Sequence, residues 1–122
     1  RLVSWLETHL LLRSGNWYDA GTALEALRSA YLQGDCPFDA ALVGLDLLLC
    51  RAEQGHWLEA AQVAREVLPV FAGFGLPGET VSALAHLELA VANLEADVIT
   101  VRSVHRLLQP YRLLPPRLAS PL

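Results

Sequence analysis

Apolar residues recur at helical spacing along most of the chain. In the stretch WYDAGTALEALRSAYLQ, residues 17–33, Ala20, Leu24 and Leu27 follow the spacing of one helix face, whereas Glu25 and Arg28 fall on the other side. No segment alternates apolar and polar residues between turn signals, which is the pattern of a half-buried strand. The sequence therefore predicts an all-α fold.

Glycine and proline divide this pattern into about six helices. A glycine follows each of the first three helices, at Gly15, Gly34 and Gly55. Glycine is common just after a helix because it adopts a positive φ without steric cost. The predicted helices cover about residues 2–13, 18–33, 38–54, 58–72, 79–95 and 97–109.

Prolines and one aspartate refine these boundaries. Pro69 lies inside the fourth predicted helix and should kink or end it near residues 65–67, because proline lacks a backbone N–H. Asp97 is suited to the N-cap of the sixth helix, and Pro110 is expected to end that helix. The proline-rich tail, residues 110–122, is expected to be extended or disordered.

Two stretches of the sequence repeat each other. RSGNWYDAGTALEAL and EQGHWLEAAQVAREV align without gaps, so that Gly15 matches Gly55 and Trp17 matches Trp57 at an offset of 40 residues. Each copy lies between two predicted helices, which makes the repeating unit a helical hairpin. A weaker third copy begins near Val81. The hairpins are expected at about residues 1–33, 38–73 and 79–109, together forming one helical-repeat domain over residues 1–109.

The motifs GNWYDA and GHWLEA resemble the turn between the two helices of a tetratricopeptide repeat. Longer loops of the DCPFDAAL type also resemble the C-terminal helical repeats of large bacterial regulatory proteins. The sequence departs from the family pattern at Leu11 and Arg51, where a large aromatic is usual, and the third unit has no glycine–aromatic turn. The resemblance implies antiparallel hairpins stacked as a short right-handed solenoid, with Gly15, Trp17, Gly55 and Trp57 as structural turn residues.

In tetratricopeptide-like arrays the first helix of each hairpin lines a concave surface. Carried over to this chain, that arrangement implies a mostly apolar groove, which a partner should cover. The alternative is that the sixth helix folds back and fills the groove. The residues expected in the groove are Leu2, Trp5, His9 and Leu12 of the first helix, Leu42, Leu45, Leu49 and Glu53 of the third, and Leu84, Leu87 and Val91 of the fifth.

The composition of the chain limits the kinds of partner that it can bind and indicates the cellular compartment in which it is expected. The chain has 122 residues, is 53% hydrophobic and carries a formal net charge of −4, with no cluster of basic residues, so nucleic acid and anionic membranes are not expected partners. The richest apolar run, ALVGLDLLLC, is too short to span a membrane.

Because the chain lacks methionine, we expect it to be a piece of a larger protein. Cys36 and Cys50 have no metal or redox spacing, which indicates free thiols in a reducing, cytoplasmic compartment.

The residues that could carry chemistry do not form a known catalytic pattern. His9, His56, His86 and His105 match no metal-binding motif, and the sequence contains no nucleophile elbow or phosphate-binding loop. Asp46 interrupts the most apolar helix, where an unpaired carboxylate would be costly. Arg51 or Arg13 could pair with it, and the alternative is an ion pair on the helix face or an exposed carboxylate. From the sequence we expect that the protein is not an enzyme and that it binds no cofactor and no metal.

Two functional hypotheses follow from the sequence. The first is a protein-interaction or scaffolding module that presents its apolar concave surface to a protein or peptide. The second is a structural or regulatory segment of a larger bacterial protein, which could associate with another copy of itself and has no ligand of its own. A weaker third hypothesis is a small-molecule sensor pocket between helices.

Overall fold

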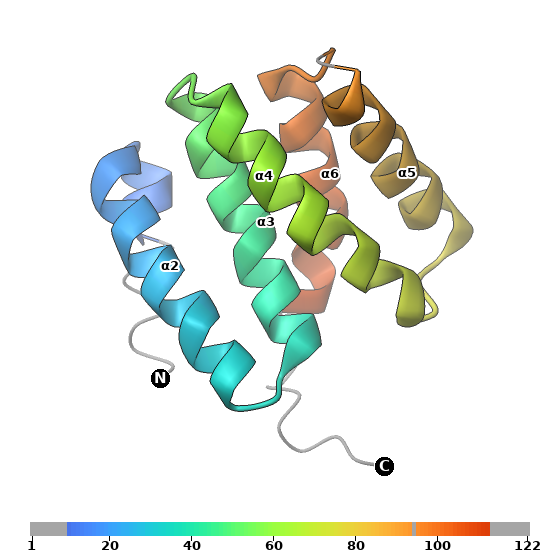
Figure 1. Cartoon of the computed structure of the whole chain (residues 1–122), viewed down its shortest axis with the longest axis horizontal. Coiled ribbons are helices and arrows are strands. Elements are labelled where there is room, and N and C mark those ends of the chain that lie inside the picture. The colour runs from blue at the N-terminus through green and yellow to red at the C-terminus, as the bar shows by residue number, and fades with distance from the viewer. Residues whose placement is uncertain (1–9, 94, 113–122) are drawn as a thin grey trace.

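A computed structural model describes residues 10–93 and 95–112, and this part of the chain is helical and contains no strand. The all-helical prediction is confirmed for these residues. The beginning of the first predicted helix and most of the proline-rich tail lie outside them. Helical residues 10–14 precede α2 (Trp17–Gln33), α3 (Pro37–Glu53), α4 (Trp57–Val67), the 3-10 helix η1 (Leu68–Gly73), α5 (Gly78–Ala92) and α6 (Val98–Arg112) (Figure 1).

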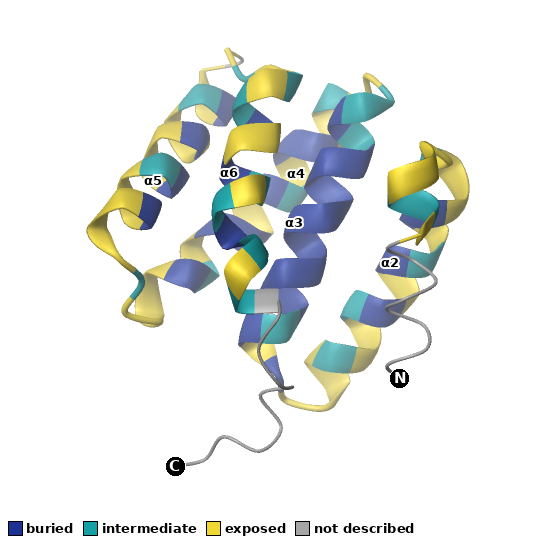
Figure 2. Ribbon diagram, turned by 180° about the vertical axis from the view of Figure 1, so that it is seen from behind, coloured by how far each residue is buried: buried dark blue, intermediate teal, exposed yellow. Residues whose placement is uncertain are grey.

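Helix α3 lies at the centre of the fold. Every residue from Ala40 to Cys50 is buried, and Figure 2 shows this helix as the most continuously buried element. Its neighbours are α2, α4, η1 and α6. A helix that is apolar on all sides is stable in water only when it is covered on all sides. The arrangement of the other helices follows from this requirement.

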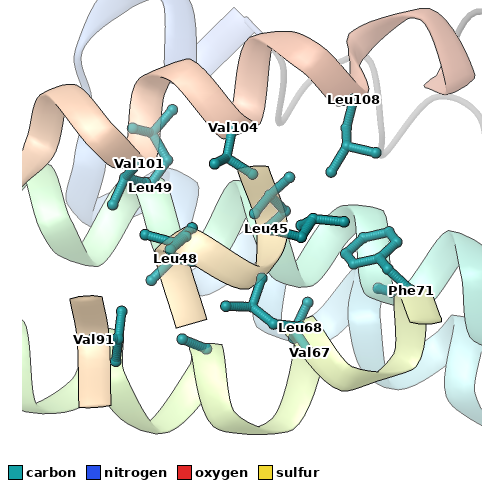
Figure 3. Packing of buried hydrophobic residues seen from close by; sticks show 14 of the residues in the cluster. Leu45, Leu48, Leu49, Val67, Leu68, Phe71, Val91, Val101, Val104 and Leu108 are labelled. Atoms are coloured by element: carbon teal, nitrogen blue, oxygen red, sulfur yellow. The ribbon is translucent and has the colours of Figure 1, made fainter. Parts of the chain in front are cut away.

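Helix α6 covers one side of α3. Figure 3 shows Val101, Val104 and Leu108 of α6 directed at Leu45 and Leu49 of α3, and all five side chains are buried in one cluster. The first, third and fifth helices were expected to line one inner face, but here α6 is the main neighbour of α3 on this side. Helix α5 packs instead on α4, η1 and α6.

Pro69 ends the fourth helix as predicted. Helix α4 ends at Val67, and Pro69 lies near the start of η1. Pro69 lies in the first turn of η1, where a backbone N–H would have no intrahelical acceptor, so the missing donor does not interrupt this 3-10 helix. Phe71 of η1 is thereby placed in the core, where its ring meets that of Phe38 edge to face at 5.7 Å between centroids.

The predicted start of the sixth helix is confirmed, but its predicted end is wrong. The Thr100 backbone N–H donates to Asp97 Oδ1 over 2.8 Å, and this N-cap hydrogen bond lowers the pKa of the Asp97 carboxyl. Pro110 does not stop the helix, which continues to Arg112. Pro110 lacks a backbone N–H, so the helix loses one hydrogen bond near its end. The ring of the next residue, Tyr111, lies 6.2 Å from the ring of Phe38, and this contact packs the last turn of the helix against the core.

Four helical units end at backbone positions spaced by 20 residues. The positive φ angles of the described residues occur at Gly15, Asp35, Gly55 and Gly75. The 40-residue offset in the sequence therefore spans two steps of a shorter, 20-residue spacing. The same type of hydrogen bond closes the turn at the first three positions. In each turn the residue that follows the positive-φ residue donates its backbone N–H to the carbonyl oxygen of the residue five positions before it. These bonds are Asn16 N to Leu11 O at 3.0 Å, Cys36 N to Tyr31 O at 2.9 Å and His56 N to Arg51 O at 2.9 Å.

The same spacing continues into the helices. Each of the four turns is followed, four residues on, by an acidic residue close to the positive end of a helix dipole, and one residue later by a small buried side chain. Each of these helices therefore has a negatively charged side chain in its first turn, followed by a small side chain that is buried in the core. The acidic residues are Asp19, Asp39, Glu59 and Glu79, and the buried ones are Ala20, Ala40, Ala60 and Thr80.

The first prediction concerns the close approach of α3 and α4. A Cβ placed on Gly44 would collide with the Val67 side chain of α4. We expect Gly44→Ala to lower the free energy of unfolding by about 1–3 kcal/mol through overpacking, although alanine is the better helix former by about 1 kcal/mol. Gly78→Ala is the matched control, since a Cβ there meets nothing within 4 Å. Urea denaturation of both variants tests this, and a Gly44→Ala protein as stable as the control would contradict the packing.

The second prediction concerns Asp35, the non-glycine residue with a positive φ, 59°, among those described. We expect Asp35→Gly to raise the free energy of unfolding by about 0.5–1 kcal/mol, because glycine adopts this conformation without steric cost. The reverse change at the equivalent turn, Gly55→Asp, should lower stability by a similar amount. Thermal unfolding of the two variants provides the comparison. The equivalence of the turns is wrong if Asp35→Gly destabilises while Gly55→Asp has no effect.

Candidate functional site

The residues expected to line an apolar groove are buried instead. Leu45, Leu49, Leu87 and Val91 are at most 8% exposed, and they belong to the same hydrophobic cluster as Val101, Val104 and Leu108 of α6. They therefore present no surface to a partner. Of the two arrangements considered from the sequence, the structure has the one in which the last helix fills the groove. Leu42 and Leu84 are buried in the same cluster.

The other predicted groove and turn residues have separate environments. Trp5 and His9 lie outside the described residues, and Leu12 is half-buried against the cluster between α2 and α3. Gly15 and Gly55 occupy the positive-φ turns. Both Trp17 and Trp57 are half-buried, and each packs against one hydrophobic cluster at the start of its helix.

A charged cleft lies between α2 and α4, with α3 as its floor. Helices α2 and α4 both pack on α3 and lie on either side of it (Figure 1). The volume of this α2–α4 cleft is about 390 Å³, within the range of small-ligand pockets. Its lining residues are Glu25, Arg28, Ser29 and Leu32 of α2, Leu47 and Arg51 of α3, and Glu59, Gln62, Val63 and Glu66 of α4.

Arg51 links the three helices at the floor of the cleft. Its side chain is 16% exposed, and Nη2 donates to Glu25 Oε2 over 2.9 Å, while Nε lies 3.7 Å from Glu59 Oε1. A Cβ on Gly21 would lie 2.7 Å from Nη1 of the arginine, so this glycine in mid-helix leaves the space that the guanidinium occupies. The position of Arg51 is thus fixed by both packing and charge.

Arg28 is the second arginine of the cleft. Its Nη1 lies 3.2 Å from Glu66 Oε1, which joins α2 to α4 across the cleft. Its Nε is shielded from solvent and has no hydrogen-bond partner among the described residues. A buried donor without a partner costs about 1–3 kcal/mol of stability.

The rim of the cleft is acidic and its floor is basic. The side chains of Glu25, Glu59 and Glu66 are 59%, 63% and 48% exposed, whereas those of Arg28 and Arg51 are 21% and 16% exposed. With three carboxylates and two guanidinium groups, the lining has a net charge of −1. The carboxylates are therefore the groups that an approaching molecule meets first.

Asp46 lies on another side of α3 and is paired with His105 of α6. The distance between Asp46 Oδ1 and His105 Nε2 is 2.6 Å, and the aspartate is 3% exposed. The expectation of an arginine partner from Arg51 is wrong, because that side chain points to Glu25 and Glu59 at the cleft. The pair joins α3 to α6 and gives the buried carboxylate a hydrogen-bond partner, which limits its desolvation cost.

Neither cysteine has the surroundings of a reactive thiol. Both side chains are buried, and this burial raises the pKa of Cys36 and of Cys50, which keeps the thiols protonated at neutral pH. Cys50 Sγ donates to the Trp17 carbonyl oxygen over 2.8 Å and so fastens α3 to the start of α2. Its environment is that of a core residue.

Within residues 10–93 and 95–112, no group of three or more His, Cys, Asp or Glu side chains could hold a metal ion. The helices in the same ranges include none with the length and apolar character of a membrane span. The comparisons with known proteins add no further assignment. No family profile, curated protein or solved structure matches the chain.

Sequence reasoning did not identify the α2–α4 cleft, although one signal pointed to it. Arg51 occupies a position at which the resembled repeat has a large aromatic residue, so this position departs from the repeat pattern. In the structure this arginine leaves the core and faces the cleft. The charged residues of α2 and α4 do not indicate a cleft in the sequence, because most helices at a protein surface carry charged residues on their outer face.

The third prediction compares two polar links between α3 and α6. A double-mutant cycle of Asp46→Ala and His105→Ala should give a coupling free energy of about 1–3 kcal/mol, because the hydrogen bond is short and enclosed. The matched cycle uses Glu53 and Arg102, whose side chains are 14% and 52% exposed and are joined by hydrogen bonds of 2.7 and 2.9 Å. The coupling between Glu53 and Arg102 should be smaller and should fall when salt is added, since half of the Arg102 side chain is exposed to solvent and ions.

Chemical denaturation at two salt concentrations measures both couplings. Equal couplings for the two pairs, or a smaller one for Asp46 and His105, would mean that the buried pair does not hold α6 on α3.

Proposed function

We propose that this chain is a protein-interaction module that binds a polypeptide segment in the α2–α4 cleft, and that it is not an enzyme. The observation that carries the proposal is the construction of the cleft floor. Gly21, at a cost of about 1 kcal/mol in helix propensity, leaves room for the Arg51 guanidinium. Charged side chains held in fixed positions around a hollow favour recognition of another molecule.

A polypeptide suits the chemistry of the cleft. Carboxylates at the rim, guanidinium groups at the floor and the half-exposed Leu32 call for a ligand with donors, acceptors and apolar groups together. Two large apolar side chains, Tyr18 and Leu58, are 74% and 85% exposed near the starts of α2 and α4, the two helices that form the cleft. They could extend the contact with a bound segment beyond the cleft.

The helical-repeat origin suggested by the sequence is also part of this proposal. The 20-residue spacing of the turns supports it, because helical arrays are built by stacking repeated structural units. Such arrays commonly bind polypeptides along one face. We propose that α6 closes the array in this chain, which leaves the α2–α4 side as the binding face in place of the apolar inner groove.

A second candidate function is supported by the outer face of α5. Val81 and Leu89 of that helix are 45% and 61% exposed, and Ile99 of α6 is 70% exposed. These side chains favour the second hypothesis drawn from the sequence, in which the chain is a structural segment of a larger protein or associates with another copy of itself.

The fourth prediction tests the module directly. A random peptide library displayed on phage and selected against the whole chain should give a recurring motif, and a synthetic peptide of that motif should shift the backbone amide resonances of the α2–α4 cleft. Ser29→Trp places a large ring on an exposed position of the lining without changing charge. This variant should weaken peptide binding at least tenfold, whereas Ser82→Trp, on the exposed face of α5, should not.

Two results would contradict the proposal. If selected peptides shift residues of α5 and ignore Ser29→Trp, the binding face is elsewhere. If no peptide is selected and light scattering shows a stable dimer that Leu89→Glu dissolves, the second candidate function is correct.

A further inference from the structure

We propose that two copies of this chain associate through the outer face of α5, with the two α5 helices antiparallel and related by a two-fold axis that passes next to Ala85. Such a dimer gives the second candidate function a defined partner and a defined geometry. It does not depend on the α2–α4 cleft, because that cleft is lined by other helices. The exposure of the α5 residues, their repeat positions and their order along the helix all support this dimer.

The outer face of α5 carries an apolar stripe. Val81 and Leu89 are 45% and 61% exposed, and Ala85 and Ala92 are exposed as well. Because an α-helix has about 3.6 residues per turn, these four side chains, called the α5 stripe, lie in one sector of the helix surface. Figure 2 shows exposed residues along the outer side of this helix. Apolar side chains gathered on one exposed face are typical of an interaction site.

The internal repeat shows that the same positions are buried in an earlier unit. The corresponding residues of α3, 40 positions before the α5 stripe, are at most 8% exposed and belong to the main hydrophobic cluster. They are Ala41, Leu45, Leu49 and Ala52. Where α5 has Ala85, the exposed positions of α2 and α4 that correspond to it carry Glu25 and Arg65. The α5 stripe therefore has the composition of a contact between helices and differs from the charged outer faces.

The order of the residues favours a second copy as the partner. Val81 and Leu89 lie four residues on either side of Ala85, and Gly78 and Ala92 lie seven residues on either side. When two such helices pack antiparallel about Ala85, Val81 of each copy is at the same height as Leu89 of the other. An isologous contact requires a pattern that is complementary to itself in this way. Large and small side chains also alternate along the stripe, which allows the two helices to interdigitate.

The charged residues of α5 are compatible with the antiparallel dimer. The helix contains two glutamates, Glu79 and Glu88, and no arginine or lysine. In the antiparallel pair, Glu88 of one copy is at the same height as Ser82 of the other, so no carboxylate meets another. A parallel pair would place Glu88 beside Glu88 of the other copy, and like charges brought together cost free energy.

We expect the association to be weak and to strengthen with salt. One pair of helices buries less area than the roughly 1,200 Å² of the smallest stable interfaces, which corresponds to a dissociation constant of about 10 μM to 1 mM. Each copy carries a formal net charge of −4, so the two copies repel each other at low ionic strength. Added salt screens this repulsion and leaves the apolar contact in place.

The fifth prediction tests the two-fold axis by cross-linking the whole chain. Ala85→Cys should form a disulfide-linked dimer under mild oxidation, because the axis brings the two introduced thiols together. Ala92→Cys is the matched control in the same stripe, and it should cross-link at least tenfold more slowly, because it lies about 10 Å along each helix from the axis. The native thiols of Cys36 and Cys50 are buried and are the same in both variants.

Charged variants test the register by sedimentation equilibrium of the reduced chain. Leu89→Glu should weaken dimerisation at least tenfold, whereas Leu58→Glu, at an exposed apolar position of α4, should leave it unchanged. Adding Val81→Lys to Leu89→Glu should restore most of the lost affinity, because the antiparallel register places the lysine of one copy level with the glutamate of the other. Circular dichroism establishes that each variant is folded.

Three results would overturn the inference. The first is a chain that stays monomeric at about 1 mM, which would leave the α5 stripe to a segment of another protein. The second is cross-linking of Ala92→Cys as fast as that of Ala85→Cys, and the third is a dimer that Leu89→Glu does not weaken. The peptide selection reports on the α2–α4 cleft and can succeed or fail in each case. Failure of this inference is therefore distinguishable from failure of the proposed function.

Discussion

The central constraint on this fold is that α3 must be shielded from water on every side. Residues Ala40–Cys50 are all buried, and each large apolar side chain in that run gains about 1.5–3 kcal/mol when it leaves water. Two neighbouring helices cannot surround a third one. Helix α2 covers one side, α4 with η1 another, and α6 the side that faces Leu45 and Leu49. The one carboxylate in the run, Asp46, is accommodated because α6 brings His105 within 2.6 Å of it.

The same constraint produces the candidate site. Because the chain turns back after each helix, α2 and α4 both run opposite to α3 and lie on either side of it (Figure 1). The space between them is bounded below by α3, where Leu47 contributes an apolar floor and Arg51 a charged one. Arg51 is compatible with the central helix because Gly21 on α2 admits its guanidinium and Glu25 pairs with it. The cleft is thus a consequence of helix packing, and Arg51 gives it a charged floor.

Much of the local structure could be predicted from the sequence, because each signal acts within a few residues. Gly15 and Gly55 mark turns, Asp97 caps a helix, and Pro69 ends one, since these effects depend on backbone geometry alone. The role of α6 could not be read from the pattern. Periodicity indicates that Leu45, Leu49, Leu87 and Val91 share apolar faces, but any apolar helix face can cover them. Pro110 illustrates the same limit, since the helix continues past it to Arg112 and Tyr111 packs on Phe38, which lies far away in the sequence.

Amide hydrogen exchange tests directly whether α6 is part of the core. If α6 completes the cover of α3, the amides of Val101, Val104 and Leu108 open together with those of Leu45, Leu48 and Leu49. Their free energies of opening should then agree within about 1 kcal/mol, as expected for one cooperative unit. Exchange of the α6 amides at rates typical of loops, while the α3 amides stay protected, would contradict this account. It would mean that the apolar face of α3 and α5 is open in solution.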